Sequence, residues 1–422
     1  MIQTLVMDNG LRLVAERLPY LRSASAGVFL KAGSMLETPG ENGLSHFIEH
    51  MAFKGTQGKN ARQIAEEIDL LGGNVNAGTS KVATSYYART TDKDLRRSLQ
   101  LLADLTARPA VKAEDFEKER QVVLEEIAME ADTPEDLVFN LSHRAVFGEQ
   151  SLSRTILGGR DAISGYTVQE LTRFMSRFYQ PANAVLSVTG RFEFERLAEW
   201  AREAFSGWEG GQTAGYPPNA PLEGVRTLVM DKDTEQAHLC VSYPGVHSLH
   251  PDRHALAILS TALGGGVSSR LFQRVREERG LVYNIYSMPA FYPACGEFII
   301  YAACAPGKLV QVLDLVRQET DDLARHGLQE KEFEQARAQM ETGFVLGMES
   351  AYQRMSSLGM NLLMHEKIVA PRETLRKMRA VSRADAGRVA RDILSGDAKY
   401  AFVGKQVAKH LKKKGIAIDG QA

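Results

Sequence analysis

The sequence predicts an α+β protein made of two duplicated α/β-roll units, each an antiparallel-rich sheet covered by helices, which a linker joins. The chain has 422 residues, of which 44% are apolar, so it is long enough to form two cores. Glycine and proline are dense between residues 207 and 221, and a similar order of strands and helices precedes and follows this stretch. We therefore expect an N-terminal unit over 1–210, a linker over 211–221 and a C-terminal unit over 222–422.

The first half begins with strand patterns and continues mainly with helices. Apolar and polar residues alternate around Asn9-Gly10, which predicts a β-hairpin. Helical spacing begins near Gly43 and ends at Gly55, where glycine favours a left-handed cap. The other predicted elements are a strand over 23–32, a helix over 61–71, two strands within 74–90, and helices over 92–106 and 113–132.

The second half repeats this plan with low sequence similarity, which indicates an internal duplication of one α+β unit. Long helices are expected toward its end. The elements predicted before them are a strand over 236–243, helices over 254–263 and 270–278, and strands over 282–287 and 297–303.

Composition excludes several classes of function. The 51 basic and 52 acidic side chains give a net charge of −1, which removes the overall electrostatic argument for nucleic-acid binding. Three cysteines without a C-x-x-C pair favour a reducing compartment. The pattern of a secretory signal is absent, as is any apolar run of the ~18 residues that a membrane span needs. We expect a cytoplasmic protein without a membrane partner.

The run SHFIEHMAFKGT contains the strongest chemical pattern of the chain. In a helix, His46 and His50 lie four residues apart on one face, and Glu49 lies on the same side. Two imidazoles and a carboxylate suit a Zn²⁺ site, and H-x-x-E-H is a metallopeptidase signature. A solvated polar stripe, or a histidine pair that caps a core, is the alternative for the pentapeptide alone.

The long helix predicted over 113–132 carries a second set of carboxylates. Glu119 and Glu126 are seven residues apart, two turns along one half-apolar face. A solvated charged stripe is the simpler interpretation of this helix by itself, because glutamate favours helices. A catalytic zinc site with two histidines, however, needs a third protein ligand and an open position for water, which makes Glu126 a candidate.

The second half has no counterpart of this pattern. At the comparable helix, His254 is followed by Ala257 and Ile258 where a glutamate and a histidine would be required. The neighbouring His247 and His250 have no carboxylate at ligand spacing, so we expect a surface or capping role for that cluster. One candidate catalytic site is predicted.

Four motifs in order resemble the inverzincin metallopeptidases of the pitrilysin and insulinase type. These are GLSHFIEHMAFKGT, NVNAGTSKVATSYYAR, VLEEI and LFQRVREERGLVYNIYS. The layout is similar to the mitochondrial processing peptidase β subunit and its bacterial relatives, over essentially the whole chain. The resemblance implies His46, His50 and Glu126 as zinc ligands and Glu49 as general base.

The resemblance also implies roles around the metal. Glu119 would support a ligand from outside the coordination shell, and Phe53 would line the pocket for the residue after the scissile bond. Substrates would bind as an added β-strand on the edge that contains Asn76 and Ala77.

In the second half, Arg276 and Tyr283 match an Arg and Tyr pair that serves the zinc site, where a guanidinium and a phenol could stabilise an oxyanion. Two positions depart from the family pattern. Of the acidic pair that receives a substrate arginine, only Asp136 is acidic, because the other position is Asn140. The strand position that is commonly acidic is Val82.

We therefore expect a zinc-dependent endopeptidase that cleaves unfolded or short peptides in a closed chamber, through zinc-activated water with Glu49 as general base. Larger relatives build the chamber from four such units, whereas this chain has two. We therefore expect a homodimer in a bacterial cytoplasm, or a heterodimer with an inactive paralogue. One alternative is a non-catalytic or heterodimeric assembly subunit of a processing-peptidase-like complex. A structural zinc protein is a weaker one, because such sites are usually closed by four Cys or His ligands.

Overall fold

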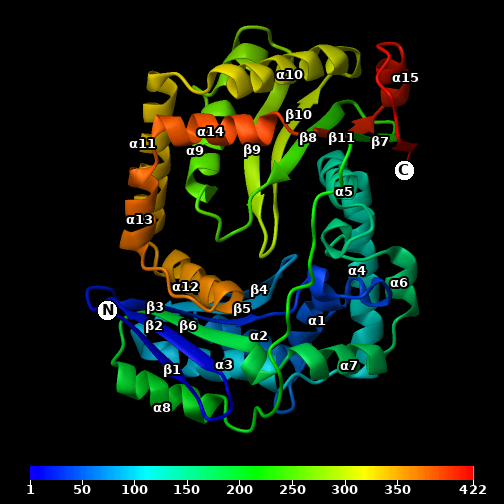
Figure 1. The fold of residues 1–422 in the computed structure, drawn as a ribbon. Coiled ribbons are helices and arrows are strands. Elements are labelled where there is room, and N and C mark those ends of the chain that lie inside the picture. Colours follow the sequence, from blue (N-terminus) through cyan, green and yellow to red (C-terminus); the bar gives the residue numbers. More distant parts are fainter. Residues whose placement is uncertain (422) are drawn as a thin grey trace. The chain divides into compact units, whose positions relative to one another are not determined.

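A computed structural model describes residues 1–421 of the chain. They form two compact units, each with one six-stranded sheet and covering helices (Figure 1), which confirms the predicted α+β class. No helix within the described residues has both the length and the apolar composition that a membrane crossing requires. The first unit comprises Met1–Ala128, Thr155–Pro217 and Leu346–Ala370, and the second comprises Met129–Arg154, Pro218–Val345 and Pro371–Ala422.

The sheet of the first unit has the strand order β1-β2-β6-β3-β5-β4. Strands β2 and β6 are parallel, and all other neighbours are antiparallel. The strands are β1 (Ile2–Val6), β2 (Arg12–Arg17), β3 (Ser23–Leu30), β4 (Val75–Thr79), β5 (Thr84–Thr91) and β6 (Ala184–Gly190).

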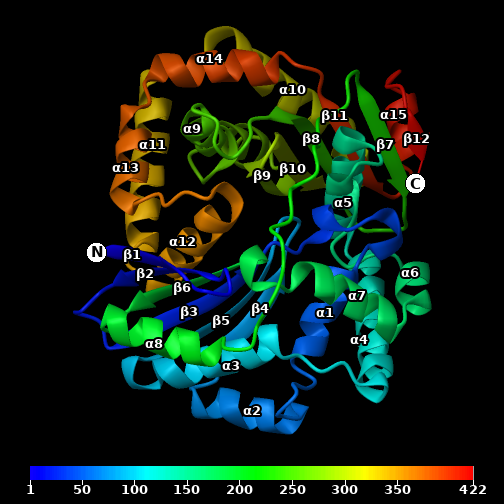
Figure 2. The ribbon, with the colours of Figure 1, turned by 60° about the horizontal axis from the view of Figure 1, so that its bottom comes forward.

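Helices cover both faces of this sheet. One face packs with α3 and α8 around the larger apolar core, and α12 lies across the other face (Figures 1 and 2). The helices that lie in this unit or begin in it are α1 (Leu44–Ala52), α2 (Ala61–Leu70), α3 (Leu95–Ala107), α4 (Ala113–Asp132), α6 (Arg160–Gly165), α7 (Val168–Phe178), α8 (Phe194–Ala204) and α12 (Ala351–His365).

The second sheet repeats the first in the order β12-β7-β11-β8-β10-β9. The parallel pair β7 and β11 corresponds to β2 and β6, and β8 corresponds to β3. The edge strand β12 is also parallel to β7, whereas β1 is antiparallel to β2. The strands are β7 (Arg226–Asp231), β8 (Ala237–Gly245), β9 (Val282–Phe291), β10 (Gly296–Cys304), β11 (Lys399–Gly404) and β12 (Gly420–Gln421). The helices are α5 (Pro134–Phe147), α9 (Arg253–Gly264), α10 (Leu309–His326), α11 (Glu330–Gly347), α13 (Pro371–Ala380), α14 (Arg383–Leu394) and α15 (Val407–Lys412), together with the π-helix η6 (Phe272–Glu277).

The two halves of the chain exchange one helix each. From the second half of the chain, α12 packs on the first sheet, where the Arg354 guanidinium pairs with Glu16 at 2.7 Å and the Ser187 hydroxyl donates to the Met355 carbonyl at 2.7 Å. A side chain at Gly359 would meet the Phe29 ring, with its Cβ only 2.3 Å from that ring, so glycine permits the close approach.

From the first half of the chain, α5 packs on the second sheet. There the buried carboxylate of Glu297 bonds to both Ser142 and His143 of α5, at 3.1 and 2.8 Å. The segment 208–222 has no regular structure, and it includes the predicted linker. The linear division into 1–210 and 222–422 therefore differs from the compact units in two segments, 129–154 and 346–370, because the apolar faces of α5 and α12 are buried on the sheet of the other half.

Candidate metal centre

The H-x-x-E-H pattern lies on α1, and the N-cap residue of this helix, Gly43, has a φ of 97°. A Cβ at this position would lie 2.5 Å from the Leu157 carbonyl oxygen, so both space and backbone favour glycine. The buried carboxylate of Glu37 accepts hydrogen bonds from the backbone N–H groups of Gly43 at 2.9 Å and Ser45 at 2.8 Å. Burial raises the pKa of Glu37. This carboxylate satisfies donors that the first turn of a helix leaves without partners.

The far end of α1 differs from the sequence-based expectation, because the predicted left-handed cap at Gly55 is wrong. The C-cap is Phe53, whose backbone remains right-handed. Gly55 instead forms an isolated antiparallel bridge with Asn60, so the chain leaves the helix without a positive φ. The Phe53 ring is half-buried, with its centroid 6.3 Å from that of Tyr86.

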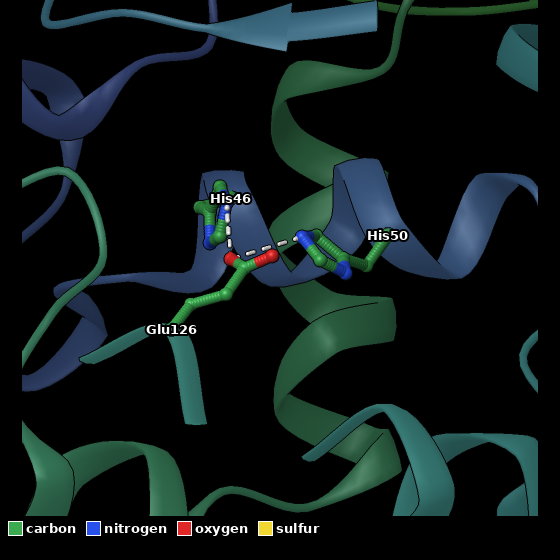
Figure 3. A group of neighbouring side chains, drawn as sticks. All are labelled: His46, His50 and Glu126. Carbon is green, nitrogen blue, oxygen red and sulfur yellow. Dashed lines mark ion pairs between the residues drawn. The ribbon is translucent and has the colours of Figure 1, made fainter. Parts of the chain in front are cut away.

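Three side chains of the predicted ligand set converge on one point (Figure 3). The Nε2 atoms of His46 and His50 both lie 3.4 Å from Oε2 of Glu126 on α4. One ligand atom from each residue can be chosen so that all three lie within 4.8 Å of one another. Among residues 1–421, no other group of His, Cys, Asp or Glu side chains meets the same condition.

The chemistry of this group fits a zinc ion. Burial, followed by the neighbouring His50, lowers the pKa of His46 to about 4, so its imidazole is neutral at neutral pH. Neutral imidazole nitrogens and a carboxylate oxygen are the donors of catalytic zinc sites with three protein ligands. The set therefore supplies three donors and leaves a fourth position open.

Glu49 lies beside the ligands and contacts the edge strand. The Thr79 hydroxyl, at the end of β4, donates to Oε2 of Glu49 at 2.5 Å and lies 3.3 Å from the Thr84 hydroxyl. Burial raises the pKa of Glu49 above its ordinary value, although the Thr79 bond acts in the opposite direction. A carboxylate with a raised pKa is suited to accept and return a proton.

Glu119 lies behind His50 and is only 5% exposed. Its Oε2 is 3.2 Å from Nδ1 of His50, and its Oε1 is 2.7 Å from Nζ of Lys54. A proton on Nδ1 that is donated to Glu119 leaves the Nε2 lone pair directed at the ligand point. Glu119 thus occupies the supporting place that the family resemblance implies.

The predicted substrate strand β4 forms an edge of its sheet. It is the last strand in the order, and within the described residues it pairs with β5 alone. Asn76 is exposed and Ala77 is half-buried on this strand. The Ala77 N–H donates to the Asn76 side-chain oxygen at 2.8 Å. The Asn76 side chain therefore already bonds a backbone N–H on the edge strand that an added strand could use.

The other predicted site residues belong to the second unit. The structure brings Arg276 and Tyr283 together, with the guanidinium carbon 5.1 Å from the ring centroid. Arg276 lies on the π-helix η6, a rare form that is frequent at functional sites, and Tyr283 is 76% exposed. Asp136 is exposed on α5, whereas the Asn140 amide donates to Glu130 at 3.1 Å.

Two of the three histidines in the cluster of the second unit have the capping role that was predicted. Nδ1 of His247 accepts from the backbone N–H of Leu249, and Nδ1 of His250 accepts from that of Asp252. His254 is buried, and its pKa is lowered to about 4, mainly by burial. The Nδ1 atoms of His247 and His250 therefore stabilise the turn before α9 and do not form a metal site.

Three residues of the site were not predicted: Thr79, Lys54 and Glu37. Lys54 follows His50 by one helical turn, and that spacing was a signal available in the sequence. Thr79 and Glu37 come from a strand and a loop, so their contacts depend on the tertiary fold.

Comparison with known proteins identifies the family. The model described as Insulinase (Peptidase family M16) matches residues 12–160, and the one described as Peptidase M16 inactive domain matches residues 165–340. An uncharacterized zinc protease of Streptomyces coelicolor is 36% identical over 410 residues, which cover 96% of this chain and 89% of that protein. The chain belongs to the M16 peptidase family.

Another relative and two solved structures are similar over nearly the whole chain. An uncharacterized zinc protease of Bacillus subtilis is 36% identical over 404 residues, covering 96% of this chain and 98% of that protein. The crystal structure of a Helicobacter pylori protease has a TM-score of 0.89 at 24% identity and covers 96% of this chain and 99% of that one. A Pseudomonas fluorescens structure described as a peptidase M16 inactive domain has a TM-score of 0.89 at 20% identity, over 96% and 98% of the two chains. These two structures show a shared fold.

Proposed function

We propose that this M16 family member is a zinc-dependent endopeptidase that cleaves unfolded or short peptides bound as an added strand along β4. The convergence of His46, His50 and Glu126 on one point beside Glu49 carries the proposal. The relatives named zinc proteases support the same metal and the same class of reaction.

The protein groups then have separate tasks in hydrolysis. A zinc ion held by His46, His50 and Glu126 would supply a Lewis acid that makes water a stronger nucleophile at neutral pH. Glu49 takes the proton from the attacking water and returns it to the leaving amine. The Thr79 hydroxyl keeps one oxygen of Glu49 in place, which leaves the other free for proton transfer.

Substrate binding and charge stabilisation complete the proposal. An extended peptide would pair its main chain with the open edge of β4, which places little demand on its sequence. Phe53 offers an apolar contact for a substrate side chain. Arg276 and Tyr283, which lie together on the second unit, would donate to the developing oxyanion. Asp136 alone provides one charge for a basic substrate residue.

The test replaces Glu49 by glutamine and measures both metal content and hydrolysis of a peptide library. Glu49→Gln is expected to retain zinc and to lose hydrolysis by at least ~100-fold, because proton transfer is removed while the ligands remain. Glu125→Gln, an exposed glutamate beside Glu126 on the same helix, is the control and should behave as wild type. Full activity of zinc-loaded Glu49→Gln would contradict the proposal.

A non-catalytic or heterodimeric assembly subunit is the second candidate, and the match of residues 165–340 to an inactive-domain model favours it. The two candidates differ in what the purified chain does alone. A homodimer that hydrolyses peptides without another protein supports the endopeptidase. A chain that binds zinc but requires a second, different subunit for hydrolysis supports the alternative.

A further inference from the structure

We propose that Lys54 is a positioning residue of the metal centre, which fixes the Glu119 carboxylate and thereby orients the His50 imidazole. This inference rests on the zinc site of the proposed function but does not require peptide hydrolysis. Lys54 would act through Glu119, without contact to the metal or to substrate.

A continuous chain of polar contacts leads from Lys54 to the ligand point. Nζ of Lys54 is 2.7 Å from Oε1 of Glu119, and Oε2 of the same carboxylate is 3.2 Å from Nδ1 of His50. Nε2 of His50, on the opposite side of the ring, is 3.4 Å from Oε2 of Glu126. Both oxygens of Glu119 are therefore engaged, and rotation of its carboxylate would break two contacts.

Burial makes this pair different from an ordinary surface ion pair. The side chain of Glu119 is 6% exposed, and that of Lys54 is 36% exposed. A carboxylate removed from water needs a charged or hydrogen-bonding partner, whereas exposed pairs contribute little. Lys54 is the only lysine or arginine paired with Glu119 among the described residues.

The charges around the ligand point also support a role for Lys54 at the metal centre. Three carboxylates act on the imidazoles of the site: Glu119 and Glu126 contact His50, and the charge of Glu49 interacts with His50. A zinc ion carries two positive charges, so one negative charge would remain without Lys54. The ammonium group supplies that third positive charge at a distance that does not compete for the metal.

A simpler role would be stabilisation of α1 itself. Lys54 follows the last turn of this helix, and its backbone N–H donates to the Met51 carbonyl, so its charge also lies near the negative helix end. That role would change the melting temperature of the metal-free protein but would not change zinc affinity selectively. The two roles are therefore separable by experiment.

The experiment measures the zinc dissociation constant by competition with a chelator in wild type, Lys54→Met, Lys54→Arg and Lys118→Met. Lys118 is a matched control, because its Nζ lies 2.7 Å from Glu114 on α4, but both of those side chains are exposed. Lys54→Met is expected to weaken zinc binding by ~10- to 100-fold, as loss of an outer partner of a metal ligand does. Lys54→Arg should restore most of the affinity, and Lys118→Met should not change it.

A double-mutant cycle tests whether Lys54 affects zinc binding through Glu119. In the Glu119→Gln background, Lys54→Met should add little further loss, because both substitutions break the same chain of contacts. The NMR signal of the His50 Nδ1 proton should exchange faster in Lys54→Met than in wild type. Additive losses in the cycle, or an unchanged zinc dissociation constant in folded Lys54→Met, would overturn the inference.

The outcomes separate this inference from the proposed function. If wild type binds no zinc, the metal site of the proposed function is wrong. If wild type binds zinc and Lys54→Met binds it equally well, only the role of Lys54 is wrong. If Lys54→Met does not fold, Lys54→Gln keeps a hydrogen-bond donor without the charge and is expected to show the same direction of change in zinc affinity.

Discussion

Two helices hold corresponding places in the two units, but only one of them carries a candidate metal site. The first, α1, follows β3 and packs near β4, and α9 follows β8 and packs near β9. Each contains a histidine that is shielded from water: His46 in α1 is half-buried, and His254 in α9 is buried. Burial lowers the pKa of both to about 4, so both imidazoles are neutral at neutral pH.

The difference lies in what faces each histidine. His46 faces His50 and the carboxylate of Glu126. The other charges that act on His254 are cations, Arg253 and Lys377, which lower its pKa further. A neutral imidazole that is shielded from water is therefore not sufficient for a metal site, because ligands from a second helix must also converge on the same point.

The largest expected effect comes from removal of a ligand. His50→Ala should reduce zinc affinity by more than the ~100-fold that loss of an outer partner causes, because a direct donor is lost. His254→Gln should retain one zinc per chain, since it does not touch the ligand point. Elemental analysis of both purified variants checks the comparison, and equal zinc content in the two variants would break it.

The next prediction concerns a variant that carries the H-x-x-E-H pattern on α9. Ala257→Glu with Ile258→His would place H-x-x-E-H on this helix, but no counterpart of Glu126 is expected to complete a site there. Because Ile258 is 0% exposed, the double variant should lose ~2–4 kcal/mol of unfolding free energy. Denaturant titration and zinc analysis measure the two effects. A second bound zinc ion would show that helix spacing alone can form the site.

A smaller effect is expected in the pH dependence of stability. Between pH 6.5 and about 4 the unfolded chain protonates His254, whereas the folded chain keeps it neutral, so the free energy of unfolding falls as the pH is lowered. The loss from this residue is at most ~3 kcal/mol. Metal-free His254→Gln should therefore lose less stability than metal-free wild type over this range. Parallel pH curves for the two proteins would contradict the lowered pKa.

The smallest predicted effect concerns Thr79. Thr79→Val removes the 2.5 Å hydrogen bond to Glu49 and leaves the three zinc ligands unchanged. Hydrolysis should fall by about 10-fold at unchanged zinc content, because the general base loses a partner that orients it. Thr79→Ser, which keeps the hydroxyl, should retain most of the activity. Full activity of Thr79→Val would contradict this role of the hydroxyl.

The sequence predicted much of the site because its information is local. The four-residue spacing of His46 and His50 fixes their common face once a helix forms, whereas the need for a third ligand made Glu126 only a candidate and the family resemblance implied it. Strands β4 and β5 were also predictable from the Thr, Val and Tyr content of residues 74–90, but the edge position of β4 was implied only by the family resemblance. Thr79 and Glu37 were missed, since a side-chain contact between elements leaves no periodic signal, whereas Lys54 was missed although its spacing from His50 is visible in the sequence.

The exchange of helices could not be predicted for a different reason. Buried residues of α12 such as Met355 and Leu363 show that one helix face is covered, but not which sheet covers it. The central strand β6 was missed as well, because all seven of its residues are buried and show no alternation. Long-range packing, rather than local pattern, decides both features.

X-ray absorption at the zinc edge of the zinc-loaded protein tests the central claim most directly. We predict one zinc ion per chain with two imidazole ligands, oxygen ligands and no sulfur, and loss of one imidazole contribution or of the metal in His46→Ala. A sulfur ligand, four imidazoles, or an unchanged spectrum in His46→Ala would contradict it.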